Sequence, residues 1–192
     1  HRWYKCSLCE QQYHGVVFCA LGWACWKTYL GRPEDDWARR NAMTELGTGL
    51  SCAQRHAETL TVREAELATL RRIGAPERDI LSSQSSLANT YEELGRTQDA
   101  PRLRRDIYFG FLNLGCEETK DALIAGSNYA THLNRLERYA EAKPLLRKLM
   151  PVARRVLGNN DETALKMRWN YAEALYEDDG ATLDDLRESV TT

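Results

Sequence analysis

The sequence predicts an all-α protein, a right-handed solenoid of antiparallel helix pairs with no β-sheet. The first observation is a repeat of 42 residues: Asn128-Tyr129-Ala130 returns as Asn170-Tyr171-Ala172, and Ala130 falls on Ala88 in the other direction. The second is that each repeat carries apolar residues at helical spacing in two successive stretches. The third is that no stretch shows the apolar alternation of a β-strand. Repetition at this period is typical of stacked helical units that bury a continuous core.

The unit from Ser127 to Arg168 shows most clearly how one helix pair is built. Its second helix is predicted over Tyr139–Leu157, where apolar residues form one broad face. Gly158 follows, and glycine tolerates the left-handed conformation that ends many helices. Asp161 is then expected to cap the next helix. The first helix of the unit carries four apolar residues at helical spacing, namely Tyr129, Ala130, Leu133 and Leu136.

The other elements follow in order along the chain. Residues 1–12 form a short polar segment that carries cysteines. Residues 13–33 contain a tryptophan-rich helix over Tyr13–Leu30, apolar on nearly all sides, which is expected to cap the first repeat. Residues 34–192 make up about three and a half repeats, at 34–75, 76–117, 118–160 and, truncated, 161–192. The remaining helices are expected at Glu34–Arg55, Ala57–Ile73, Pro76–Leu94, Thr97–Leu114 and Glu118–Leu136, then from Asp161 and from about Ala181.

Composition and charge narrow the classes of function. The 192 residues include 26 basic and 28 acidic side chains, for a net charge of −2. A dedicated nucleic-acid binder should instead show a basic excess. The longest apolar run, residues 15–26, is much shorter than the roughly 20 residues of a membrane span. Six unevenly spread cysteines favour the cytoplasm or another reducing compartment over a disulfide scaffold. We therefore expect a protein or peptide partner, and no pattern indicates an oligomeric state.

The sequence contains no catalytic motif. GxSxG, P-loop, GxGxxG and HExxH patterns are absent, and the four histidines are scattered. Acidic pairs such as Asp35-Asp36 and Asp184-Asp185 fall at helix starts or turns, where the helix dipole favours them. We therefore expect that the protein is not an enzyme. Because the chain begins at His1 and stops inside an expected helix, we also expect it to be part of a longer protein.

The repeated residues resemble a known family. Asn128-Tyr129-Ala130, the segment RYAEAKPL at 138–145 and RVLG at 155–158 resemble the tetratricopeptide repeat, in the 42-residue form of kinesin light chain. The resemblance covers about Ala38 to the end of the chain. It implies a non-catalytic scaffold that binds other proteins, with the first helix of each repeat lining an inner face.

The resemblance also implies which residues line that face. In the family, they lie three before and one, four and five after the small alanine of each repeat. Their mixed, somewhat acidic character favours an extended partner with basic or aromatic side chains. Carried over, the partner-binding groove comprises Ser85, Asn89, Glu92, Glu93, Ser127, Thr131, Asn134, Arg135, Trp169, Glu173, Tyr176 and Glu177.

A cysteine pair near the N-terminus has the spacing of half a zinc site. Two thiolates of one tight turn, Cys6 and Cys9, can bind the same Zn²⁺. His14 and Cys19 would complete the spacing of a zinc knuckle, but on the predicted helix they lie about 140° apart. The alternative is that further ligands lie upstream, since Trp3–Cys9 resembles the last cysteine pair of a RING-CH-type zinc module. The protein itself then requires no cofactor, and Cys6 and Cys9 bind zinc only if those upstream ligands are present. The plainer interpretation is that the cysteines are reduced and structural.

Three functions are consistent with these patterns. The main one is a protein-protein interaction scaffold that holds an extended partner in the groove. The second is the substrate-recruiting part of a zinc-finger, RING-like ubiquitin ligase or adaptor. The third is a structural subunit of a larger complex, docked by the tryptophan-rich helix. Exposure of Trp23 or Trp26 would favour this third function, because isolated proteins rarely expose large apolar patches.

Overall fold

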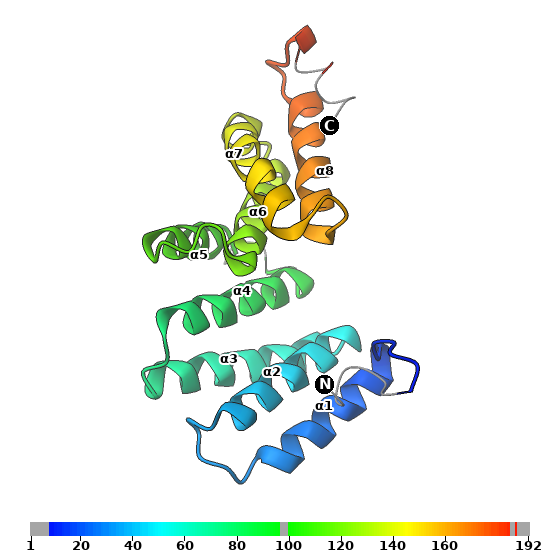
Figure 1. Ribbon diagram of the computed structural model, residues 1–192, viewed down its shortest axis with the longest axis vertical. Helices are drawn as coiled ribbons and strands as arrows, with labels where there is room; N and C mark the ends of the chain where they lie inside the picture. Colours follow the sequence, from blue (N-terminus) through cyan, green and yellow to red (C-terminus); the bar gives the residue numbers. More distant parts are fainter. Residues whose placement is uncertain (1–7, 97–99, 185–186, 188–192) are drawn as a thin grey trace. The chain divides into compact units, whose positions relative to one another are not determined.

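The computed structural model describes residues 8–96, 100–184 and 187, and this part of the chain is helical (Figure 1). No β-strand occurs among the described residues, so the predicted all-α class is confirmed. None of the described helices is both long and apolar enough to cross a bilayer. The helices are α1 (Gly15–Tyr29), α2 (Trp37–Cys52), α3 (His56–Arg72), α4 (Glu77–Glu93), α5 (Ala100–Asn113), α6 (Lys120–Arg135), α7 (Tyr139–Leu157) and α8 (Glu162–Glu177).

The helix bounds lie within two residues of the sequence prediction, except at α2 and at the predicted start of α5, whose residues 97–99 lie outside the described part of the chain. Helix α2 is three residues shorter at each end than the predicted Glu34–Arg55. At its start, the Asp36 carboxylate accepts hydrogen bonds from the main-chain N–H groups of Ala38 and Arg39, at 2.8 and 3.1 Å. At its end, Gln54 adopts a left-handed φ of 58°. Capping at both ends therefore makes the helix shorter than the sequence predicted.

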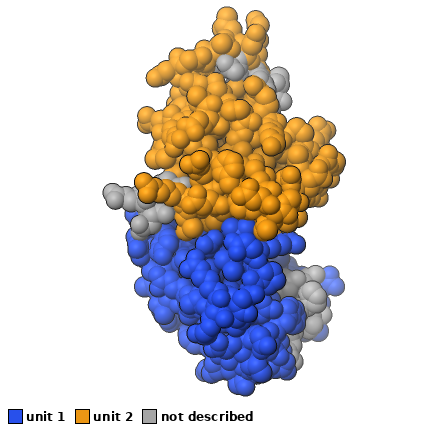
Figure 2. Space-filling view, turned by 90° about the vertical axis from the view of Figure 1, so that its left-hand side faces the viewer, with its two compact units in different colours: residues 1–100 blue, residues 101–192 orange. Residues whose placement is uncertain are grey.

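The chain forms two compact units, residues 1–100 and 101–192, which Figure 2 colours separately. In unit 1, α1 packs closely against α2 because two glycines lie where the helices cross. A Cβ at Gly49 would stand 2.9 Å from the carbonyl oxygen of Phe18, and one at Gly22 would stand 3.1 Å from that of Glu45. The two helices therefore touch backbone to backbone.

The core beneath α1 includes both of its tryptophans. Cys19 of α1 is buried with Leu46 and Leu50 of α2, and Trp23 and Trp26 pack partly buried against this cluster. Both tryptophans are half-buried, so the exposure that would favour a docked structural subunit is not observed. The large apolar side chains that α1 does expose are Val16 and Val17.

In unit 2, α7 packs against α6 and α8, and the fully buried side chains include Leu123, Leu146, Met167 and Tyr171. A glycine again sets the packing distance. A Cβ at Gly126 would lie only 2.7 Å from Cδ1 of Leu149 in α7. The predicted cap of α8 is confirmed, since the Asp161 carboxylate accepts a 2.8 Å hydrogen bond from the Thr163 N–H.

Candidate functional site

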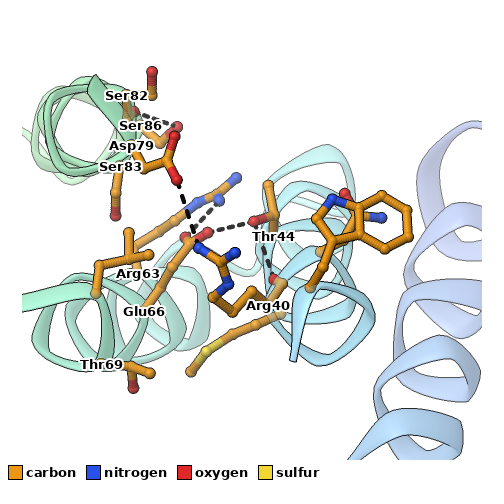
Figure 3. A pocket seen from close by; sticks show the side chains of 13 residues that line it. Arg40, Thr44, Arg63, Glu66, Thr69, Asp79, Ser82, Ser83 and Ser86 are labelled. Carbon is orange, nitrogen blue, oxygen red and sulfur yellow. Dashed lines mark hydrogen bonds and ion pairs between the residues drawn. The ribbon is translucent and has the colours of Figure 1, made fainter. Parts of the chain in front are cut away.

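A pocket of about 280 Å³ opens on unit 1 between α2, α3 and α4. Figure 3 shows Arg40 and Thr44 of α2, Arg63 and Glu66 of α3, and Asp79 of α4 around it. Helices α2 and α4 are the first helices of the repeats predicted in this unit. The pocket therefore lies beside the face that was expected to meet a partner.

A buried ion pair forms one wall of the pocket. Arg63 Nη1 lies 2.9 Å from Glu66 Oε2, and the two side chains are 7% and 9% exposed. Arg63 Nη2 also donates to the Thr48 hydroxyl at 2.9 Å, and the Thr44 hydroxyl donates to the Glu66 carboxylate. Both charges are thus compensated and hydrogen-bonded, which is the condition under which an ion pair can be buried at little net cost.

Two further polar atoms in the pocket are buried without a hydrogen-bond partner. They are Nε of Arg40 and Oγ of Ser83, whose side chain is 7% exposed. The terminal Nη1 of Arg40 reaches Asp79 Oδ2 at 3.5 Å, so its guanidinium is held between α2 and α4 while its Nε–H is unused. Figure 3 shows Ser83 and Asp79 on the side of α4 that faces the other two helices. A buried N–H donor and a buried hydroxyl therefore belong to residues that line the same pocket.

Trp37 stands at the edge of this pocket and is 71% exposed. It is the first residue of α2 and directly follows the capping Asp36. An exposed tryptophan beside a polar pocket offers a flat apolar surface, and tryptophan is a common anchor in protein interfaces. The pocket thus combines hydrogen-bonding groups with an aromatic rim.

In unit 2, polar side chains link the first helices α6 and α8 directly. The Asn134 side-chain amide donates to the Asn170 carbonyl and to the Glu173 carboxylate, both at 2.8 Å. The Asn170 amide in turn donates to the Thr131 hydroxyl at 2.7 Å. Thr131, Asn134 and Glu173 were predicted from the family resemblance to contact a ligand. Here they hold one helix to the next.

The predicted groove residues differ widely in exposure. Glu93, also predicted, pairs with Ser51 and with His56 Nδ1 on unit 1. The structure brings together Thr131, Asn134 and Glu173 in unit 2. The exposed residues are Asn89, Glu93, Arg135, Trp169, Glu173, Tyr176 and Glu177. The half-buried ones are Ser85, Glu92 and Thr131, and the buried ones are Ser127 and Asn134.

The place of each residue's repeat in the stack explains this difference in exposure. Ser127 and Asn134 are 1% and 5% exposed, whereas Trp169 and Tyr176, which lie 42 residues later, are 74% and 66% exposed. Helix α8 lies over α6, as the bonds of Asn134 show, and covers Asn134. Within the described residues no further first helix covers the same positions of α8. Trp169 and Tyr176 therefore form an exposed aromatic face. Their equivalents in the preceding repeat, Ser127 and Asn134, are buried instead.

The N-terminal cysteines can be placed only in part. Cys6 lies outside the described residues, and Cys9 is exposed. Cys19 lies inside α1, is buried, and contacts Nη1 of Arg55 at 3.8 Å. In the part of the chain that the structure describes, no three His, Cys, Asp or Glu side chains are grouped as a metal would require. The zinc site at Cys6 and Cys9 stays a prediction.

The pKa shifts have structural causes. The Arg39 main-chain N–H holds the pKa of the Asp36 carboxyl below its ordinary value, and the Thr163 N–H does the same for the pKa of Asp161. Burial raises the pKa of Glu45 and of Tyr108, which pack in helix interfaces. These groups are helix caps and packing residues, and they do not converge on the pocket.

Comparison with known proteins identifies the fold. No protein-family model and no curated protein matches this sequence. Among solved structures, the chain is similar to a candidate kinesin light chain of Podosopora anserina with nearly identical TPR-like repeats. The identity is 18% and the TM-score 0.62, over 91% of this chain and 80% of that one. A single-residue variant of that protein gives the same identity and a TM-score of 0.65, over 91% and 79%.

Another similar structure is BtubC (BKLC) from P. vanneervenii, with 14% identity and a TM-score of 0.74, over 90% of this chain and 69% of that one. Identities this low establish the fold alone. The fold is an all-α solenoid of tetratricopeptide-like repeats, as predicted from the 42-residue period. The neighbours also agree with the resemblance to the repeats of kinesin light chain.

Proposed function

We propose that this chain is a non-catalytic interaction scaffold that binds a segment of another protein at the pocket of unit 1. The observation that carries this proposal is the pair of buried polar atoms there, Arg40 Nε and Ser83 Oγ, which bond to no group of the protein. Leaving a buried donor or acceptor unpaired costs roughly 1–3 kcal/mol. A ligand that bonds to both atoms removes that cost, so the pocket favours binding. The tetratricopeptide-like fold, whose repeats present extended surfaces, supports the same function.

The balance of charge in the pocket favours an uncharged polar group. Two guanidinium groups, Arg40 and Arg63, face two carboxylates, Glu66 and Asp79. An added charge would therefore be unpaired. A carboxamide fits better because its oxygen accepts from the Arg40 Nε–H, while its NH₂ donates to the Ser83 hydroxyl or to Asp79. We infer an asparagine or glutamine side chain as the anchor, with Trp37 against a neighbouring ligand residue. This anchor differs from the basic or aromatic one expected from the sequence.

Peptide selection tests the proposal. A displayed library of random peptides is selected on the immobilised chain, and the affinity of enriched peptides is measured by fluorescence anisotropy. We expect enriched peptides to share an Asn or Gln. Changing that residue to Ala should weaken binding about tenfold, because two hydrogen bonds to buried groups are lost.

Variants of the chain locate the site. Arg40→Ala and Ser83→Ala should each weaken the selected peptides by about tenfold. Arg71→Ala is the matched control, since Arg71 is exposed on α3 and lies outside the pocket. Thermal unfolding shows whether each variant is folded. If no peptide is enriched, or if the enriched peptides bind Arg40→Ala and Ser83→Ala as tightly as wild type, the pocket does not bind a partner.

A further inference from the structure

A pocket of about 360 Å³ opens on unit 2 among α5, α6 and the first turn of α7. Its size falls within the range of roughly 300–1,000 Å³ that is typical of pockets for small ligands. Helix α7, the second helix of the predicted third repeat, already contributes Arg138 and Glu141 to the wall of the pocket. The pocket is therefore the space that stays open when the neighbouring helices of the stack are in place.

This pocket carries an excess of positive charge. Arg102 and Arg105 of α5 lie three residues apart, so they share one side of the helix, and both are exposed. Neither forms an ion pair with an Asp or Glu of the described residues. The other two charged residues of the wall compensate each other, since Arg138 Nε and Nη2 donate to the two carboxylate oxygens of Glu141, at 2.7 and 2.8 Å. Two guanidinium charges are thus left for an acidic group of a ligand.

Aromatic and apolar side chains lie in the same pocket, next to these charges. The rings of Phe109 and Tyr129 pack edge to face, with their centroids 6.5 Å apart. Phe109 stays 44% exposed, and Leu136, which also lines the pocket, is 46% exposed. Arg105 Cζ lies 5.7 Å from the centre of the Phe109 ring, so a cation stands beside this apolar surface. A flat ring placed there would remove apolar surface from water.

The charge and the apolar wall together select one kind of ligand. The carboxylate of Asp or Glu carries a single negative charge and would leave one guanidinium uncompensated. A phosphate monoester carries about −1.5 to −2 charges at pH 7 and offers three strong acceptor oxygens. Such a group matches two guanidinium groups, which bind phosphate through parallel hydrogen bonds. Phosphoserine would bring this charge without a ring, whereas phosphotyrosine brings both.

We propose that this pocket binds a phosphotyrosine side chain of a partner protein. The phosphate pairs with Arg102 and Arg105, and the ring lies against Phe109 and Leu136. The site is separate from the pocket of unit 1 and takes a different ligand. Its test is also independent, because a library of unmodified peptides contains no phosphotyrosine.

Three labelled peptides test the proposal by fluorescence anisotropy with the whole chain. They share one glycine- and serine-based sequence and differ at a single central residue, which is phosphotyrosine, phosphoserine or tyrosine. We expect the phosphotyrosine peptide to bind, and to bind more weakly as salt is raised. The phosphoserine peptide lacks the ring and the tyrosine peptide lacks the phosphate, so each should bind about tenfold more weakly or not at all.

Variants of the chain locate the site. Arg102→Gln with Arg105→Gln should weaken the phosphotyrosine peptide about tenfold or more, because both counter-charges are lost. Phe109→Leu removes the aromatic face, keeps an apolar side chain, and should weaken the same peptide about threefold. The matched control is Lys148→Gln with Arg154→Gln, which removes the same charge from exposed residues of α7 outside the pocket. It should change binding by less than about twofold. Circular dichroism establishes that each variant is folded, and Arg105→Gln alone replaces the double change if that variant is not.

Five results would each overturn the proposal. Absence of binding by the phosphotyrosine peptide removes the ligand. Equal binding by the tyrosine peptide removes the phosphate, and equal binding by the phosphoserine peptide removes the ring. Unchanged binding after Arg102→Gln with Arg105→Gln places the peptide elsewhere on the chain. An equal loss in Lys148→Gln with Arg154→Gln shows attraction by net charge only.

Discussion

A glycine determines where the buried charge of unit 1 lies. A Cβ at Gly47 of α2 would stand 2.9 Å from both Cζ and Nε of Arg63, so any other residue there would push the guanidinium away. In this position Arg63 pairs with Glu66 and reaches Thr48. The ion pair, and one wall of the pocket with it, therefore depends on the absence of a side chain at residue 47.

Removal of one partner of this ion pair should strongly destabilise the fold. In Glu66→Ala, Arg63 keeps its charge in a site that is 7% exposed and loses its carboxylate. Breaking a buried pair in this way costs about 3–5 kcal/mol. Urea unfolding followed by circular dichroism should show the loss as a lower midpoint with an unchanged slope.

Glu64 provides the control, because it lies two residues earlier on the exposed side of α3. Glu64→Ala should change the free energy of unfolding by less than about 0.5 kcal/mol. A loss of similar size in both variants would mean that the pair is reached by water and is not buried as described.

The sequence predicted some site residues and missed others, because a repeat period shows which residues are equivalent but not how the helices pack. Thr131, Asn134 and Glu173 were identified by their place in the repeat, and they do come together. The hydrogen bonds that they make between α6 and α8 were not predicted, because a one-dimensional period does not say which neighbouring helix meets a position. The pocket of unit 1 was missed altogether, since it depends on how three helices approach. The sequence did contain one signal for this pocket, namely Gly47. It stands 41 residues before Ala88, at the place in the repeat where the later units have a small alanine.

At the scale of the helix, local signals determined how well each boundary was predicted. Helix α7 was predicted at both ends, and at its C-terminal end Gly158 takes a positive φ of 91° where the apolar pattern stops. Helix α2 was predicted too long, because its start was placed directly after Pro33 and its apolar pattern runs on to Ala53. Gln54 takes the left-handed conformation there without being a glycine, so the sequence carries no sign of that end. The pattern thus predicted the helices, and the caps set their ends.

The contact between α1 and α2 should depend on Gly49. Alanine is the better helix former by about 1 kcal/mol. Its Cβ, however, would lie 2.9 Å from the Phe18 carbonyl oxygen and 3.0 Å from the Cys19 Cα, which are backbone atoms that cannot rotate away. Overpacking of this kind costs about 1–3 kcal/mol, so the clash outweighs the gain in propensity. Gly49→Ala should therefore loosen α1 and lower the melting temperature.

Tryptophan fluorescence measures this loosening directly, because Trp23 and Trp26 pack beneath α1. We expect a red shift of the emission in Gly49→Ala. The control is Gly31→Ala, where an added Cβ meets no atom within 4 Å and the emission should not move. An unshifted spectrum in Gly49→Ala would show that α1 adjusts to the extra methyl group without leaving α2.

Stacked repeats touch only their neighbours, and this property of the whole molecule leads to the last prediction. Leu146→Ala opens a cavity in α7, where the side chain is fully buried, and should cost about 2–5 kcal/mol. In a solenoid the loss stays local, so hydrogen exchange read by mass spectrometry should speed up in α6, α7 and α8 and stay unchanged in α1 and α2. Leu50→Ala, an equally buried leucine of α2, should give the reverse pattern. A protein with one shared core would instead lose protection in every helix after either change, and that result would contradict the solenoid as a description of how this chain is stabilised.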